Sequence, residues 1–90
     1  MPTKKPATLQ ISCVQLHWGK MLEYGLDRTL HYIGAAAKEG SRGVLFPETN
    51  LTGYYLPYVV ALRQDRIDAA LEKVRRAAAE NRISTIVGTF

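Results

Sequence analysis

The residues best placed for chemistry follow a short apolar run near the middle of the sequence. Gly43-Val44-Leu45-Phe46 predicts a buried strand, Pro47 ends it because proline cannot donate to a strand ladder, and Glu48 comes next. Open α/β sheets build their ligand crevices at the carboxyl ends of parallel strands. Because Pro47 also fixes the backbone just before Glu48, the Glu48 side chain leaves the strand end in a defined direction. Its carboxylate is therefore a candidate general base.

Aromatic side chains from two loops are placed to wall a crevice around Glu48. Trp18 follows the first apolar run, and Tyr54 and Tyr55 lie in the aromatic loop 48–57. Aromatic walls exclude water, as a general base working near neutrality requires. We therefore predict Tyr54 and Trp18 as substrate-binding residues. On physical grounds alone the alternative stays open that Glu48 is a surface loop residue, or accepts hydrogen bonds from the nearby turn.

The elements that must position these residues alternate between strand and helix periodicity. Short apolar runs predict strands at 9–16, 43–46 and 83–90. Apolar stripes at helical spacing predict helices at 26–39 and 65–80, and the aromatic loop between them has room for one helical turn. Helices of this length between short strands imply parallel strands and right-handed crossovers, so the predicted fold class is α/β in the order β-α-β-α-β.

Particular residues are predicted to set the faces and ends of these elements. The mixture of apolar residues in 9–16 suits a strand covered on both faces. Gly40 is a natural stop for the first helix and Asn81, in the left-handed conformation, for the second, while Gly34 marks close packing against the sheet. The residues predicted to face inward are Leu26, Leu30, Ile33 and Ala37 of the first helix and Ile67, Ala70, Leu71, Val74 and Ala78 of the second.

The predicted sheet is unfinished. Parallel sheets commonly have five or more strands, and this chain supplies three. The last one, 83–90, is apolar at Ile86, Val87 and Phe90 and needs a neighbour, so the sheet is left with an open terminal strand. We predict a flexible tail at 1–8 and a partial α/β domain at 9–90.

Composition excludes several classes of protein. With 47% hydrophobic and 22% charged residues among 90, the chain is too apolar for a disordered protein. The sequence has no apolar stretch of membrane-spanning length and no secretory signal, so we expect no membrane partner. A single cysteine, Cys13, forms no internal disulfide, which favours a cytoplasmic protein.

Nucleic acid, nucleotide and metal sites are also not predicted. The net charge is +4, but acidic residues sit among the arginines of the second helix, and Glu72 and Arg76 form an i,i+4 pair. Binding of nucleic acid through that helix remains the alternative. The first strand is followed by no glycine-rich phosphate motif, and no Cys/His set has metal-ligand spacing, so we expect no cofactor and no metal. His17 and His31 are predicted to be structural or surface residues.

Five short segments stand at the ends and turns of the predicted elements. They are Val14-Gln15, Ala35-Ala36-Ala37-Lys38-Glu39-Gly40, Phe46-Pro47-Glu48, Leu51-Thr52-Gly53-Tyr54 and Ile86-Val87-Gly88. In this order they make a strand ending near Gln, an Ala-rich helix end with Gly, an FPE strand end, a TGY turn and a strand ending in a VG pair. Together they resemble the N-terminal portion of the nitrilase superfamily, the carbon–nitrogen hydrolases.

The resemblance implies a catalytic Glu-Lys-Cys triad in a complete αββα sandwich, of which this chain is the first portion. Glu48 matches the Glu; the family's Lys and Cys lie beyond this chain, which alone is expected to be inactive. Cys13 is expected to be a buried small hydrophobe, and Lys73 to face solvent on its helix. The implied substrate is a small amide or nitrile, without cofactor, and the family usually forms homo-oligomers. A non-catalytic α/β interaction module, or a relic without activity, remains the alternative.

Overall fold

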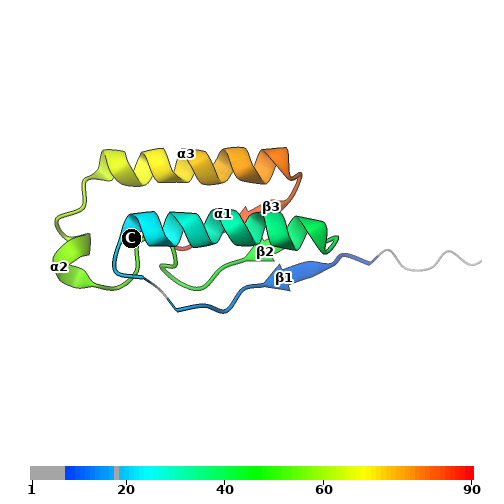
Figure 1. Ribbon diagram of the computed structural model, residues 1–90, viewed down its shortest axis with the longest axis horizontal. Helices are drawn as coiled ribbons and strands as arrows, with labels where there is room; N and C mark the ends of the chain where they lie inside the picture. The colour runs from blue at the N-terminus through cyan, green and yellow to red at the C-terminus, as the bar shows by residue number, and fades with distance from the viewer. Residues whose placement is uncertain (1–7, 18) are drawn as a thin grey trace, which may run out of the picture.

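A computed structural model describes residues 8–17 and 19–90 (Figure 1). The predicted tail lies outside the described residues except for its last residue. Three strands alternate with the two long helices, so the predicted α/β class and the order β-α-β-α-β are confirmed. The elements are β1 (Ile11–Cys13), α1 (Leu22–Lys38), β2 (Gly43–Leu45), α2 (Leu56–Val59), α3 (Gln64–Glu80) and β3 (Ser84–Ile86).

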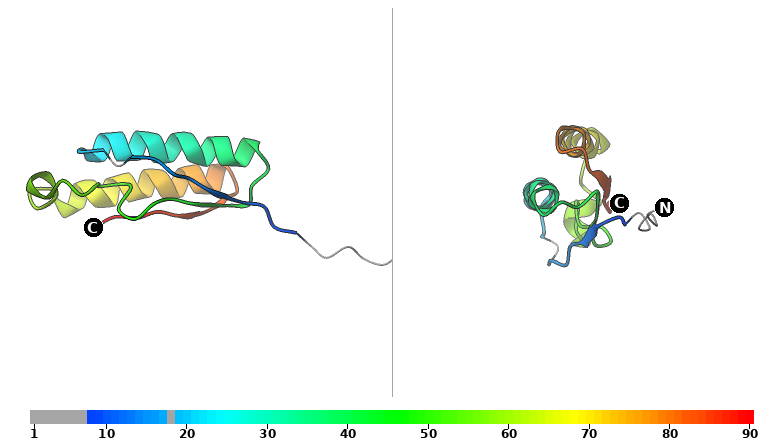
Figure 2. Two further views of the ribbon diagram at one scale, coloured as in Figure 1. Left: turned by 90° about the horizontal axis from the view of Figure 1, so that it is seen from below. Right: turned by 90° about the vertical axis from the view of Figure 1, so that its right-hand side faces the viewer.

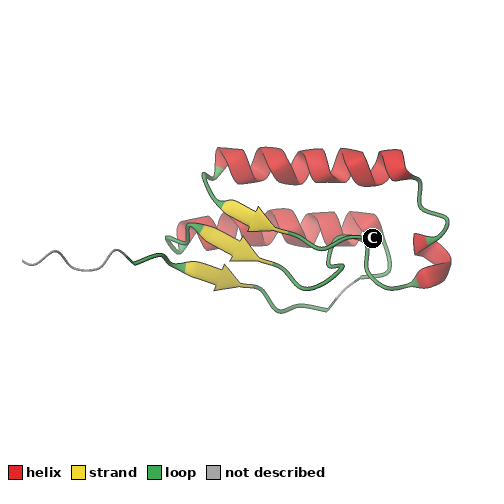
Figure 3. Cartoon of the chain, turned by 180° about the vertical axis from the view of Figure 1, so that it is seen from behind, coloured by secondary structure: helices red, strands yellow, loops and turns green. Residues whose placement is uncertain are grey.

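The three strands form one parallel sheet in the order β1-β2-β3 (Figure 3). Cys13, Leu45 and Ile86 are aligned across the sheet, so the three carboxyl ends lie at one edge. Both connections step in the same direction along the sheet. Because such crossovers have one preferred hand, this places α1 and α3 on the same face, where they pack against each other (Figure 2).

The core lies between these two helices and the sheet. Val44 of β2 points into it and is 2% exposed, whereas the next residue, Leu45, faces the other way. The stripe that α1 buries is rotated from the predicted one: of the predicted residues only Ile33 is fully buried, and α1 begins four residues earlier, at Leu22. The buried residues of α1 are Leu22, Gly25, Thr29, Ile33 and Ala36, and those of α3 are Ile67, Ala70 and Val74.

The opposite face of the sheet is open, and the prediction of a first strand covered on both faces is wrong for this structure. Ile11 and Ile86 on this face are 56% and 66% exposed. Cys13 shares the face and is also exposed, so its prediction as a buried small hydrophobe is wrong too. The reason is topological, since two crossovers in one direction supply helices to one side only.

Of the two predicted helix stops, the one at Gly40 is confirmed and the one at Asn81 is wrong by one residue. Gly40 does end α1, with a φ of 87° and the Ser41 N–H bonded to Ala36 O, as in a Schellman motif. At the end of α3 the left-handed residue is Arg82 (φ 51°), not Asn81, because Asn81 is the last αR residue of the same motif.

The close approach expected at Gly34 is absent. A Cβ atom added there would meet nothing within 4 Å. Gly25 in the first turns of α1 makes such an approach instead, since its added Cβ would lie 2.0 Å from Leu51 O. No helix in the described part of the chain is long and apolar enough to span a membrane.

Candidate functional site

Glu48 lies at the carboxyl edge of β2, the central strand of the sheet. The ladder continues one residue past this strand, with Phe46 N–H donating to Ile86 O at 2.9 Å, and the chain then turns at Pro47. Glu48 is exposed, and within residues 8–17 and 19–90 its carboxylate makes no hydrogen bond or ion pair. The side chain of Glu48 therefore accepts no hydrogen bond from the turn.

The backbone around Glu48 is a tight turn held in an unusual conformation. Asn50 N–H donates to Pro47 O at 3.2 Å, which closes a four-residue turn with Thr49 at its third position. Thr49 has a φ of 49°, a region that favours Gly or Asn and that costs a β-branched residue on the order of 1–3 kcal/mol. Its side chain is buried, and the Oγ1 atom has no hydrogen-bond partner among the described residues. Strained residues of this kind persist where surrounding contacts impose them, often at functional sites.

The contact that imposes this conformation on Thr49 comes from the chain just after β3. A Cβ atom added to Gly88 would lie 2.3 Å from Thr49 N, 2.8 Å from Pro47 O and 3.0 Å from the carbonyl carbon of Glu48. Leu51 N–H also donates to Gly88 O at 2.9 Å. The Glu48 turn is therefore packed backbone to backbone against Gly88, with no space for a side chain between them.

The predicted aromatic walls are only partly described. Tyr54 is 37% exposed and packs edge-on against Phe90, with ring centroids 5.7 Å apart. The ring of Tyr55 lies 5.1 Å from Lys20 Nζ in a cation–π contact. Trp18 lies outside the described residues. The substrate-binding roles of Tyr54 and Trp18 stay predictions.

The other chemically reactive residues make no hydrogen bond or ion pair with Glu48 in the described part of the chain. Lys73 is exposed on α3, as expected, and lines a groove between α1 and α3. Cys13 faces the open side of the sheet from β1, and His17 and His31 are exposed. Among the described side chains, no three of His, Cys, Asp or Glu gather in a group able to hold a metal ion.

Several residues that shape the site were missed by the sequence analysis. Thr29 and Asn50 are fully buried polar residues, and Gly25 and Gly88 allow close backbone approach. Thr29 lies outside the predicted apolar stripe of Leu26, Leu30, Ile33 and Ala37, so hydrophobic periodicity carries no signal for it. The sequence Asn50-Leu51-Thr52 matches a glycosylation sequon, yet the Asn50 side chain is 1% exposed and both of its amide atoms are hydrogen-bonded.

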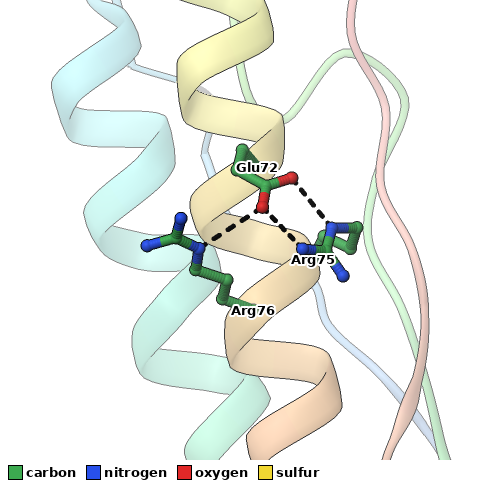
Figure 4. Close-up of polar contacts among 3 residues, drawn as sticks. All are labelled: Glu72, Arg75 and Arg76. Carbon is green, nitrogen blue, oxygen red and sulfur yellow. Dashed lines mark hydrogen bonds and ion pairs between the residues drawn. The ribbon is translucent and has the colours of Figure 1, made fainter.

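The arginines of α3 are partly neutralised by a surface cluster (Figure 4). Arg75 donates two hydrogen bonds to the Glu72 carboxylate, at 2.6 and 2.8 Å, and Arg76 donates one at 3.3 Å. The hydrogen bonds from Arg75 are the main reason that the pKa of Glu72 falls to about 2. This pairing occupies two of the cations that a nucleic-acid surface on α3 would use. The lack of a nucleic-acid partner stays a prediction.

This cluster predicts a small pH dependence of stability. Because the pKa of Glu72 is lowered in the folded state, its contribution is present above its ordinary pKa of 4.5 and is lost as the pH falls towards 2. Glu72→Gln is expected to lower the urea midpoint slightly at pH 7, since solvent screens exposed pairs, and to approach the wild type as the pH falls to 2. Glu80→Gln, which removes an exposed carboxylate from the end of the same helix, is the control. A difference between Glu72→Gln and wild type that persists unchanged at pH 2 would contradict this account.

Comparison with known proteins identifies the family. The model of the carbon–nitrogen hydrolase family matches residues 10–90. No curated protein and no solved structure matches the chain significantly. The match covers both helix crossovers, the Phe46-Pro47-Glu48 strand end and the Gly88 contact. The chain belongs to the carbon–nitrogen hydrolase family.

Proposed function

We propose that this chain supplies the general base, Glu48, of a hydrolase that cleaves non-peptide C–N bonds in small amides or nitriles. The observation that carries the proposal is the placement of Glu48 within the family match. It is an exposed carboxylate without partners in the described structure, on a turn fixed at the carboxyl edge of the central strand. Amidase and nitrilase chemistry both need such a base close to a nucleophile.

The proposed reaction uses a Glu-Lys-Cys triad. Glu48 takes the proton of a cysteine thiol, and the thiolate attacks the carbonyl or nitrile carbon. The lysine ammonium stabilises the negative charge that develops on the attacked group. With an amide, the tetrahedral intermediate expels the amine with a proton returned by the acid form of Glu48. Water then hydrolyses the thioester, releasing the carboxylic acid and the free thiol.

Two of the three groups have no match in this chain. Its one cysteine, Cys13, precedes Glu48 in the sequence and faces the open side of the sheet. Its one lysine after Glu48 is Lys73, on the exposed surface of α3. We infer that the chain is an N-terminal portion that works with a later Lys and Cys, and that it is inactive alone. We also propose that the enzyme is cytoplasmic, works without metal or organic cofactor, and acts as a homo-oligomer.

The experiment that tests this proposal starts with the gene. DNA sequencing past the Phe90 codon, with the intact mass of the native product, shows whether a Lys and a Cys follow in frame. The native product and the purified 90-residue chain are then assayed for ammonia release from a panel of small amides and nitriles. We expect turnover by a product with all three groups and none by the chain. Turnover by the chain that Glu48→Gln abolishes would overturn the need for a separate Lys and Cys.

The alternative of a non-catalytic interaction module makes a different prediction for the same purified chain. A stand-alone module is a monomer that melts in one sharp transition. The open apolar face, with Leu9 and Ile86 about two-thirds exposed, favours the hydrolase portion, which we expect to bind hydrophobic dye and to self-associate. Size-exclusion chromatography and a thermal melt distinguish the two.

A further inference from the structure

The side chain of Asn50 connects three separate parts of the fold. Its Nδ2 donates to Thr29 Oγ1 in the middle of α1 at 2.8 Å, and its Oδ1 accepts from Gly88 N–H after β3 at 2.9 Å. Thr29 in turn donates its hydroxyl proton to Gly25 O at 2.7 Å. We call the three linked residues Thr29, Asn50 and Gly88 the Asn50 bridge.

The groups that the Asn50 bridge joins fix the direction of each of its hydrogen bonds. Gly88 N–H can only donate, so it must face the amide oxygen, and Nδ2 then faces Thr29. Because the Thr29 proton is already donated to Gly25 O, its oxygen is left to accept from Nδ2. A reversed amide would set two donors against each other at Gly88. Burial makes this arrangement specific, since neither Thr29 nor Asn50 can turn to water instead.

The Asn50 bridge leads directly to the catalytic candidate. Asn50 lies two residues after Glu48 and closes the same turn through its backbone N–H to Pro47 O. Gly88, held by the Asn50 side chain, is the residue packed against the backbone of Glu48 and Thr49. On the other side, Gly25 brings the backbone of α1 against Asn50 O and Leu51 O. The Glu48 turn is thus fixed from the helix layer and from the neighbouring strand end.

We propose that Asn50 is a positioning residue for Glu48. Its amide holds the end of β3 and helix α1 in one arrangement, and that arrangement fixes the strained turn that aims the carboxylate. The proposal rests on the function proposed above and deepens it by assigning how the base is held. Misplacing a catalytic group by about 1 Å can lower turnover on the order of a hundredfold.

Three variants test the role in the native hydrolase. Asn50→Ala removes both side-chain hydrogen bonds of Asn50. Thr29→Val removes the acceptor for Nδ2, together with the hydrogen bond to Gly25 O, while keeping the side-chain shape. Thr29→Ser is the matched control because it keeps the hydroxyl. At a temperature where every variant is folded, we expect Asn50→Ala to lower kcat by about tenfold to a hundredfold with KM within about twofold. Thr29→Val should show a smaller fall in kcat, and Thr29→Ser almost none.

A second readout on the 90-residue chain does not depend on activity. In Asn50→Ala, amide hydrogen exchange at Leu51 and Gly88 should speed up by about tenfold or more, while Ile33 in α1 keeps its wild-type rate. Equal acceleration at Ile33 would mean a loss of global stability and would overturn the positioning role. Unchanged kcat in Asn50→Ala, or equal losses in Thr29→Val and Thr29→Ser, would overturn it as well.

The positioning role of Asn50 and the general-base role of Glu48 can fail independently of each other. If Glu48→Gln leaves turnover intact, the general-base assignment fails, and the exchange rates still decide whether the Asn50 bridge fixes the turn. If Glu48→Gln abolishes turnover and Asn50→Ala does not change kcat, only the positioning role fails.

Discussion

Glu48→Gln is expected to lower kcat of the native hydrolase by about a hundredfold to ten-thousandfold, the usual range for loss of a general base. The amide has nearly the size of the carboxylate but cannot accept the thiol proton at neutral pH. Both kcat and kcat/KM should fall together, since the proton transfer belongs to the transition state. Ammonia release under saturating amide measures the effect.

The same substitution should leave the fold unchanged. Glu48 is exposed and makes no hydrogen bond or ion pair within the described part of the chain, so no interaction is lost on replacement. Substitutions at such positions usually change the free energy of unfolding by less than about 0.5 kcal/mol. Glu80→Gln, at another exposed carboxylate, controls for the loss of one charge. A Glu48→Gln enzyme with more than a tenth of wild-type kcat would remove Glu48 from the mechanism.

The position of Glu48 could be predicted from the sequence because local chemistry and topology agree there. A short apolar run ended by Pro47 defines the strand end, and two helix-length connections require parallel strands, which gather their carboxyl ends at one edge. The structure has Glu48 at that edge, after β2. Its catalytic role rests on the family and stays a proposal.

The contacts that hold the Glu48 turn in place could not be predicted in the same way. Hydrophobic periodicity assigns faces by apolar residues, so it selected Leu26 and Leu30 for the inner face of α1 and passed over Gly25 and Thr29. These two are buried because of what they meet, namely the backbone at Leu51 and the amide of Asn50. Such contacts join residues more than twenty positions apart and leave no periodic signal.

The uncovered face of the sheet shows a second limit of prediction from hydrophobic patterns. Alternation along a strand separates two faces, but an apolar residue on each face does not say that both are covered. The pattern around Cys13 predicts a strand covered on both faces, whereas the strand order β1-β2-β3 leaves one face of the sheet without a helix. Strand order arises from the whole chain and is set by tertiary packing.

Gly88→Ala is expected to destabilise the protein by about 1–3 kcal/mol, the range for overpacked sites. The added Cβ would lie 2.3 Å from Thr49 N and 2.8 Å from Pro47 O. Both atoms belong to the backbone, so no side-chain rotation can relieve the clash, and the Glu48 turn must move. For a domain of this size each kcal/mol corresponds to about 4–8 °C in Tm, which a thermal melt resolves.

Gly34→Ala is the matched control, since its Cβ would meet nothing within 4 Å and it lies inside α1. Replacing an interior helical Gly by Ala should stabilise the chain by about 0.5–1 kcal/mol. The two variants add the same methyl group to the same protein and should shift Tm in opposite directions. In the native hydrolase, Gly88→Ala should also lower kcat, because the displaced turn carries Glu48, the proposed base. If the two variants melt alike, Gly88 is not packed against the Glu48 turn, and the rigid placement of the carboxylate loses its structural basis.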